Sequence, residues 1–283
     1  MILNKRKLTL TAVLLVLALF LTAGCSSQPQ PSPLSVTLMR VGKADAIALL
    51  SGSHALLIDT GEEEDGEEIL EFLRSHQIQS VDAMIITHFD KDHVGGADTV
   101  LRGIPVDTVY LPDYQGTHKT YRKFLEAAGE TGVPLQRLSQ PVTVPFADAE
   151  VLIEPPQSYE IPEGVKDWDN DFSLITTVIH GDNRLVFLGD AETRRIRQWL
   201  ESGSAEKADF LKVPHHGVYD EVLEELFSAL TPEISVICDS RKNPADPETL
   251  TLLRRFSSRI YETKDGNVTV LSDGRSLKSY QDK

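Results

Sequence analysis

Four side chains able to bind a metal ion lie within six residues of one another: His88, Asp90, Asp92 and His93. They directly follow an apolar segment, residues 83–87, on the loop between an expected strand and an expected helix. Carboxylates and imidazoles this close together converge on one point only if a cation neutralises the carboxylates. Imidazole suits Zn, Fe, Mn or Ni, and the added carboxylates favour harder ions such as Mn or Mg. The cluster therefore predicts a divalent metal centre, against the alternative of a polar surface loop.

Two further apolar segments end in side chains of the same kind. Residues 185–188 are followed, after one glycine, by Asp190, and residues 210–213 are followed, after one proline, by His215 and His216. A rigid sheet positions the loops at its strand ends, and functional residues gather there. We therefore expect these three strand ends to meet and their side chains to share one site.

The elements that must position these side chains are short apolar strands and amphipathic helices. Mixed sheets with helices outside them are expected, and no repeat of fixed period is visible. Helices are predicted around residues 69–73, from 97 to about 102, and at 119–130, 192–201, 220–230 and 247–256. Strands are predicted at 35–40, 46–50, 54–59, 83–87, 108–111, 141–144, 150–154, 173–180, 184–188, 210–213 and 233–238, with a final hairpin near residue 266.

Residues 1–24 are predicted to be a signal peptide. Positive charge at residues 5–7 precedes an apolar run at 8–21, which is short for a membrane span of ~20 residues. The sequence Leu-Thr-Ala-Gly-Cys that ends at Cys25 resembles the bacterial lipobox, in which the cysteine becomes the lipidated first residue. We therefore expect an exported protein that is lipid-anchored in the cell membrane through Cys25 and faces outward. The alternative is ordinary secretory cleavage near residues 23–24.

A short tether and one large domain account for the rest of the chain. Residues 25–34 are rich in Ser, Gln and Pro, which is typical of a flexible tether. Residues 35–283 suffice for one large domain, and no second Pro/Ser-rich linker interrupts them. Besides Cys25 the chain has only Cys238, so it can form no internal disulfide if Cys25 is acylated. Two cysteines also exclude a thiolate-rich zinc site.

The chain is acidic, with a formal net charge of −15 that becomes −18 once the three cations of the signal peptide are removed. Such a surface repels polyanions over a Debye length of ~8–10 Å. Strong non-specific binding to nucleic acid, which depends on Lys and Arg at phosphates, is therefore not expected. A phosphoester or another small-molecule substrate stays compatible with the charge, because bound metal ions are often the largest local charges in a site.

Three motifs give the chain a resemblance to the metallo-β-lactamase superfamily. His88-x-Asp90-x-Asp92-His93 resembles its signature His-x-His-x-Asp-His, with Asp90 in place of the second histidine. Asp190 resembles the bridging aspartate, and residues 214–217, Pro-His-His-Gly, resemble the final histidine motif. The resemblance implies an α/β fold, the αββα sandwich in which two mixed β-sheets pack face to face with helices outside.

Within that superfamily, the chain is similar to the hydrolase domain of ComEC-type DNA-uptake proteins, here in a free-standing lipoprotein form. The similarity runs from about residue 35 to 277, and the chain departs from it at Ala44 and Val218, where the relatives have Gly and Ser. The segments that carry the similarity are Val41-Gly-Lys-Ala-Asp-Ala46, Leu57-Ile-Asp-Thr-Gly61, Asn170-Asp-Phe-Ser-Leu174 and Leu211-Lys-Val-Pro-His-His-Gly217.

The resemblance also implies ligands and roles. One or two divalent ions, Zn or Mn, are expected, with a hydroxide as the nucleophile. The expected ligands are His88, Asp90 and Asp190 for one ion, and Asp92, His93, Asp190 and a member of the pair His215-His216 for the other. The Pro-x-His-Gly pattern favours His216 as the ligand and His215 as a substrate contact, without separating them. The expected catalytic residues are Asp92, Asp190 and His215.

The expected supporting residues are Asp59, Asn170, Asp171 and Lys212. Asp59 would orient a metal-binding histidine or, alternatively, cap the turn that follows it. Asn170 or Asp171 would take the place of the superfamily's third histidine, because His118 and His180 are both expected to face solvent. Lys212 would contact an anionic substrate or support the ligands.

The leading hypothesis for function is a phosphodiesterase or nuclease-like hydrolase. Two hard-ion positions suit in-line attack at phosphorus, and the ComEC-type branch is associated with nuclease-type activity. An alternative is a lactone, thioester or β-lactam hydrolase that uses the same hydroxide. A third hypothesis is a non-catalytic cell-surface module that binds metal.

Overall fold

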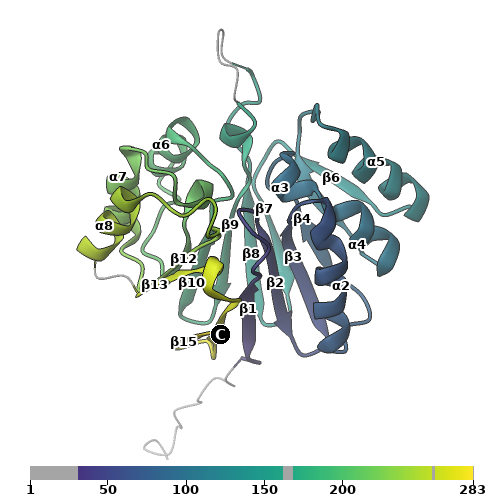
Figure 1. Ribbon diagram of the computed structural model, residues 1–283, viewed down its shortest axis with the longest axis horizontal. Coiled ribbons are helices and arrows are strands. Elements are labelled where there is room, and N and C mark those ends of the chain that lie inside the picture. Colours follow the sequence, from purple (N-terminus) through teal and green to yellow (C-terminus); the bar gives the residue numbers. More distant parts are fainter. Residues whose placement is uncertain (1–30, 162–167, 257–258, 283) are drawn as a thin grey trace, which may run out of the picture. The chain divides into compact units, whose positions relative to one another are not determined.

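The computed structural model describes residues 31–161, 168–256 and 259–282. Within them, two mixed β-sheets pack against each other, and helices cover the outer face of each sheet (Figure 1). This arrangement confirms the αββα sandwich that the sequence predicts. No helix of the described residues is long and apolar enough to cross a membrane. The predicted signal peptide, Cys25 and most of the predicted tether lie outside the described residues.

In the described chain, the first sheet has eight strands in the spatial order β15-β14-β1-β2-β3-β4-β5-β6. The strands from β3 to β6 run parallel, and the other neighbours pair antiparallel. The strands are β1 (Leu34–Leu38), β2 (Ala46–Ser51), β3 (His54–Thr60), β4 (Ala83–Ile85), β5 (Val109–Pro112), β6 (Leu135–Leu138), β14 (Val268–Ser272) and β15 (Leu277–Gln281).

The second sheet has seven strands among the described residues, in the order β13-β12-β11-β10-β9-β8-β7. The strands from β10 to β13 run parallel, and β7 to β10 pair antiparallel. The strands are β7 (Val142–Phe146), β8 (Ala149–Glu154), β9 (Ile175–His180), β10 (Asn183–Phe187), β11 (Phe210–Lys212), β12 (Ile234–Ile237) and β13 (Arg259–Glu262).

Helices from each half of the chain cover the sheet of that half. Buried residues of α2, α4 and α5 pack on the first sheet, and those of α6, α7 and α8 pack on the second (Figure 1). The α-helices are α2 (Gly66–Ser75), α3 (Lys91–Val94), α4 (Ala97–Gly103), α5 (Lys119–Thr131), α6 (Thr193–Glu201), α7 (Val222–Leu230) and α8 (Pro247–Arg255). The 3₁₀ helices are η1 (Glu63–Asp65), η2 (Asn170–Phe172), η3 (Pro214–Gly217) and η4 (Thr263–Asp265).

Alternation of side chains along the strands produces three apolar layers. In β2, Ile47 and Leu49 belong to the layer between the two sheets, whereas Ala46 and Ala48 belong to the layer under α2, α4 and α5. Central strands are therefore buried on both faces, which is why they appear in the sequence as nearly continuous apolar runs.

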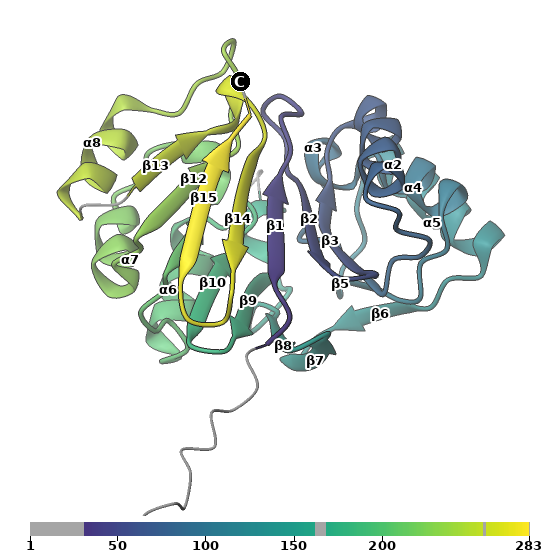
Figure 2. The ribbon, with the colours of Figure 1, turned by 90° about the horizontal axis from the view of Figure 1, so that it is seen from below.

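The C-terminal hairpin of β14 and β15 joins the first sheet beside β1 (Figure 2). It brings Ser272 to the end of β9, where His180 Nδ1 lies 2.7 Å from Ser272 Oγ and His180 Nε2 lies 3.0 Å from the Ser32 carbonyl oxygen. Only 1% of His180 is exposed. The expectation that His180 faces solvent is wrong, because segments from both ends of the domain cover it.

Candidate metal centre

Strand ends of both sheets supply the side chains of one buried cluster. Asp59 lies near the end of β3, His88 follows β4, Asp190 follows β10, and His216 follows β11. Because β3 and β4 are parallel neighbours, and β10 and β11 are too, the loops after each pair leave the same edge of a sheet. A rigid pair of sheets thus positions the side chains of four loops.

The backbone at the cluster adopts conformations that most residues avoid. Gly189 has a φ of +55°, and a Cβ there would lie 2.9 Å from the Thr87 side chain, so glycine is needed at this turn. Asp59, His215 and His216 also have positive φ, of 57°, 47° and 52°, without being glycine. Such strained positions persist where the surrounding structure holds them, and they gather at functional sites.

Hydrogen bonds determine which ring nitrogen of each histidine points into the cluster. His93 Nδ1 donates to Asp59 Oδ2 at 2.8 Å, because an ionised carboxylate can only accept. His216 Nδ1 donates to the Cys238 carbonyl oxygen at 2.9 Å, because a carbonyl also can only accept. Once Nε2 of either ring has lost its proton, it carries the lone pair that a metal ion needs.

His88 is oriented through its neighbour Thr87. The Thr87 hydroxyl donates to Asp59 Oδ2 at 2.6 Å, and the Thr87 N–H donates to Asp59 Oδ1 at 2.7 Å. Because the Thr87 hydroxyl donates its only proton to Asp59, it can only accept from His88 Nδ1, which lies 3.0 Å away. The proton of a neutral His88 ring is then on Nδ1, and Nε2 carries the lone pair. Asp59 thus orients His93 directly and His88 through Thr87. Among the described residues, no backbone group of the turn after β3 donates to the Asp59 side chain.

The three inward-facing Nε2 atoms, of His88, His93 and His216, are buried and have no hydrogen-bond partner in the described part of the chain. Asp190 Oδ2 lies 3.3 Å from His93 Nε2 and 3.0 Å from His216 Nε2. Donor atoms of His88, His93 and Asp190 lie within 4.8 Å of one another, as do those of Asp92, His93 and His216. Buried polar atoms need a partner. A divalent ion bound between these nitrogens and the carboxylates would supply one, so the residues fit a metal.

The cluster carries an excess of negative charge. Burial disfavours a charged His93, but the carboxylates of Asp190 and Asp59 outweigh it and hold the pKa of His93 well above its ordinary value. Burial likewise opposes charge on His216, yet Asp190 and Asp92 raise the pKa of His216 to about 9. A field that retains protons on two imidazoles also attracts a cation, and metal binding at these nitrogens would release the protons.

A family comparison agrees with the fold and the cluster. The sequence model of the metallo-beta-lactamase superfamily matches residues 39–238, which are more than half of the chain. The chain belongs to the metallo-β-lactamase superfamily. Proteins of this superfamily are in general metal-dependent hydrolases, and a strand-end cluster of His and Asp is consistent with such chemistry.

Two curated relatives support the ComEC-like resemblance, which is thereby confirmed. ComE operon protein 3 of Bacillus subtilis is 30% identical over 209 residues, which cover 72% of this chain and 26% of that protein. Recombination protein 2 of Haemophilus influenzae is 27% identical over 239 residues, which cover 81% of this chain and 27% of that protein. The chain therefore spans about a quarter of the length of these two relatives.

Three solved structures share the fold at low sequence identity. YhfI from Bacillus subtilis, a metallo-β-lactamase fold protein, has a TM-score of 0.57 at 12% identity, covering 88% of this chain and all of that one. Zn²⁺-bound PqqB from Methylobacterium extorquens has a TM-score of 0.51 at 14% identity, covering 77% and 85%. CmlA, a diiron β-hydroxylase from Streptomyces venezuelae, has a TM-score of 0.53 at 12% identity, covering 90% and 55%.

The structure brings six of the seven predicted ligands of this metallo-β-lactamase chain to one place: His88, Asp90, Asp92, His93, Asp190 and His216. Asp90 and Asp92 lie at its more exposed side, with 27% and 24% of their side chains accessible. His215 lies outside these donor groups, with its Nδ1 3.3 Å from Glu192 Oε1. Burial lowers the pKa of His215, which keeps this ring neutral. The two members of the histidine pair therefore have different surroundings.

Asp45 is a residue of the cluster that the sequence analysis did not single out. It is 1% exposed and forms an ion pair with Lys212, whose side chain is fully buried. Lys212 Nζ also donates to the Gly189 carbonyl oxygen at 2.9 Å and lies 3.5 Å from Asp190 Oδ1. Lys212 therefore supports Asp190 from inside the domain. Its side chain is not exposed, so the expected contact with an anionic substrate is not available in this structure. The position of Asp45 in the segment 41–46, which carries part of the resemblance, was the available signal.

Asn170 and Asp171, the residues expected to replace the third histidine, form hydrogen bonds with different partners. Asp171 Oδ1 accepts a hydrogen bond from a backbone N–H in the first turn of α6 at 3.1 Å. Asn170 Nδ2 donates to Glu192 Oε1 at 2.9 Å, the same oxygen that lies beside His215 Nδ1. His118 is half-exposed, as expected, but its Nε2 lies 3.6 Å from Asp90 Oδ1. It is therefore close to the centre as well as accessible.

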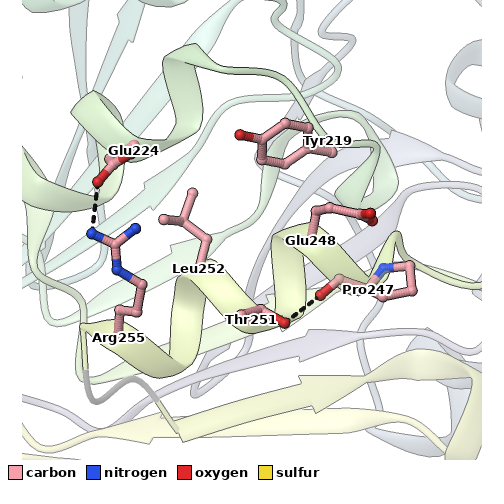
Figure 3. A pocket seen from close by; sticks show the side chains of 7 residues that line it. All are labelled: Tyr219, Glu224, Pro247, Glu248, Thr251, Leu252 and Arg255. Atoms are coloured by element: carbon pink, nitrogen blue, oxygen red, sulfur yellow. Dashed lines mark hydrogen bonds and ion pairs between the residues drawn. The ribbon is translucent and has the colours of Figure 1, made fainter.

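Two of the hollows beside the helices of the second sheet include Tyr219 in their lining. The smaller one, about 210 Å³, adjoins the centre, since its lining includes Glu192, His215 and Tyr219. The larger one, about 330 Å³, lies between α7 and α8 and contains an ion pair of Arg255 with Glu224 at 2.7 Å (Figure 3). No residue of the metal cluster lines the larger hollow. The smaller hollow is therefore the better candidate for holding part of a substrate.

Proposed function

We propose that this protein is a metal-dependent phosphodiesterase or nuclease-like hydrolase of the ComEC type. The observation that carries the proposal is the convergence of three buried imidazole Nε2 atoms, from His88, His93 and His216, on a set of carboxylates that includes Asp190. One or two divalent ions, Zn or Mn, suit this set of N and O donors. When bound, such ions lower the pKa of a coordinated water and stabilise the attacking and leaving oxygens of an ester.

The chain's own residues hold this donor set in place before any ion arrives. Asp190 Oδ2 lies within 3.3 Å of the Nε2 atoms of both His93 and His216, so we assign it the shared position between two ions. Asp59 fixes the orientation of His93, and Lys212 fixes the backbone before Asp190. Preorganisation of this kind removes the cost of rearranging the ligands during each turnover.

We assign His215 to the substrate. It lies outside the metal-binding donor groups, and it lines the hollow that adjoins the centre. With 26% of its side chain exposed, it is accessible to a bound molecule, and Glu192 orients it through Nδ1. In this place a neutral imidazole with its proton on Nδ1 can accept a hydrogen bond or a proton at Nε2, and so can serve as a general base beside the substrate.

The choice of a phosphoester rests on the donors at the exposed side of the centre. Asp90 and Asp92 add hard carboxylate oxygens, which suit the ions that bind phosphate oxygens. The Haemophilus relative is named for recombination, a process that acts on nucleic acid. The net charge of −15 weighs against tight binding along a nucleic-acid backbone. We therefore propose a substrate that is recognised through its phosphodiester at the metal centre.

We propose further that the protein is exported and faces outward from the cell membrane, anchored by a lipid on Cys25. The support for this is the sequence of residues 1–25, with its cations, its apolar run and its lipobox-like end. Substrates would then be molecules that reach the outer face of the membrane.

The test compares three substrates with a single preparation of the full chain. Metal-free protein is reconstituted with Zn²⁺ or Mn²⁺, its metal content is measured, and hydrolysis of bis(p-nitrophenyl) phosphate, a lactone and nitrocefin is followed. We expect turnover of the phosphodiester that a chelator abolishes and added metal restores. Full activity without metal, or hydrolysis of the lactone or nitrocefin alone, would contradict the proposal. Stable metal binding without hydrolysis of any of them would favour the non-catalytic module.

A further inference from the structure

A second group of candidate ligands lies at the exposed side of the centre. Donor atoms of Asp90, His118 and Asp169 lie within 4.8 Å of one another. Asp90 and His118 directly precede α3 and α5, and Asp169 directly precedes η2. The fold alone brings together these three loops, which are far apart along the chain.

Asp169 contributes a buried carboxylate to this group. Asp169 is 9% exposed, and its Oδ1 is buried without a hydrogen-bond partner among the described residues. His118 Nε2 lies 3.6 Å from Asp90 Oδ1, which is too far for a direct hydrogen bond. Neither carboxylate pairs with a lysine or arginine of the described chain.

The spacing of the donors suits a single ion between them. Ligand atoms ~2.0–2.2 Å from one ion lie at most ~4.4 Å apart. The donor atoms of the group all lie within 4.8 Å of one another, and His118 Nε2 lies 3.6 Å from Asp90 Oδ1. Half of the His118 side chain is exposed, so it is free to adjust to an ion.

The surface pair of His54 and Asp82 differs from this group, because hydrogen bonds satisfy both carboxylate oxygens of Asp82. His54 Nδ1 lies 3.1 Å from Asp82 Oδ1, and Asp82 Oδ2 accepts from the Ala55 N–H at 2.9 Å. Both oxygens of Asp82 are therefore satisfied, and no third donor of a metal-binding group joins them among the described residues. The His54 side chain is 54% exposed, close to the 50% of His118, so His54 provides a matched control.

We propose that Asp90, His118 and Asp169 form an outer divalent-cation site that shares Asp90 with the inner centre. Asp90 Oδ2 faces His88 Nε2 at 3.6 Å, while Asp90 Oδ1 faces His118, so one carboxylate connects the two sites. Two carboxylates and one imidazole favour a hard ion such as Mn²⁺. An ion here neutralises negative charge at the exposed side of the centre. The benefit of this ion to an anionic substrate rests on the proposed function. The existence of the outer site does not depend on that function.

The experiment measures Mn²⁺ binding to the metal-free full chain, purified in detergent, by the electron paramagnetic resonance signal of free Mn²⁺. The variants are His118→Gln and Asp169→Asn, with His54→Gln as the control. We expect the wild type and His54→Gln to bind one more Mn²⁺ than the inner centre holds. In His118→Gln and Asp169→Asn, the affinity of this additional ion should fall at least about tenfold, with inner binding unchanged.

A second measurement locates the additional ion. With the inner centre filled by diamagnetic Zn²⁺, proton NMR of the histidine ring signals should show His118 broadened by added Mn²⁺ in the wild type but not in Asp169→Asn. Equal Mn²⁺ stoichiometry and affinity in the wild type and His118→Gln, or a sharp His118 signal at saturating Mn²⁺, would overturn the outer site. Binding at the inner centre alone, with hydrolysis intact, would overturn the outer site and leave the proposed function standing. Absence of any Mn²⁺ and Zn²⁺ binding by the wild type would overturn both.

Discussion

Replacement of Lys212 by methionine should destabilise the metal-free protein strongly. The Lys212 side chain is 0% exposed and that of its ion-pair partner Asp45 is 1% exposed, so the variant leaves a buried carboxylate without its cation. Removing one partner of a buried pair costs about 3–5 kcal/mol. The variant also loses the hydrogen bond from Lys212 Nζ to the Gly189 carbonyl oxygen, which fixes the turn before Asp190. Lys212→Met should therefore lower the free energy of unfolding by at least about 3 kcal/mol.

The assay is urea unfolding followed by circular dichroism, with Lys91→Met as the matched control. Lys91 pairs with Glu62 at the surface, where their side chains are 62% and 37% exposed, so its loss should cost only about 0–1 kcal/mol. The double variant of Lys212→Met and Asp45→Asn should cost less than the sum of the single variants by about 0.5–3 kcal/mol. Equal costs for Lys212→Met and Lys91→Met, or additivity in the double variant, would refute the buried pair as a support of the centre.

Three further predictions concern the ligands, the anchor and the covered end of β9. Asp190→Asn should reduce metal affinity more than about 100-fold and turnover more than His215→Ala does, because it removes the shared charge. Metal content measured beside turnover tests this, and normal metal content in Asp190→Asn would contradict the shared position. Cys25→Ser should release the protein from the membrane fraction with unchanged turnover, and retention in the membrane would rule out a lipid anchor. His180→Phe should lower the free energy of unfolding by about 1–3 kcal/mol, because it leaves the buried Ser272 hydroxyl without its acceptor, His180 Nδ1. An unchanged thermal unfolding midpoint would show that this hydrogen bond contributes nothing.

Most of the candidate centre could be predicted because each ligand directly follows a short apolar strand. The residues after β4, β10 and β11 needed only local patterns, since the ends of parallel strands carry the loops of a site. Asp45 could not be found in this way. Its ion pair joins it to Lys212 in the other sheet, a contact that no local pattern of apolar residues encodes. His118 was correctly expected to be exposed, yet the turn before α5 places it beside Asp90.

The described strands were predicted except for two, and one histidine that was expected to face solvent is covered. The strands β6 and β13 are the edges of the two sheets, and both are partly exposed. Residues such as Gln136 and Arg137 in β6 give no apolar run, because an edge strand buries less of its surface. His180 is buried only because the C-terminal hairpin crosses to pair with β1. Long-range pairing of this kind depends on the complete sandwich.

The most direct test of the metal centre is anomalous X-ray scattering from crystals of the protein with Mn²⁺ or Zn²⁺. We predict an anomalous peak about 2.0–2.2 Å from the Nε2 atoms of His93 and His216, and next to an oxygen of the Asp190 carboxylate. The same crystals should lose this peak after treatment with a chelator. Crystals of protein with full hydrolytic activity and no anomalous peak at Asp190 would contradict the account.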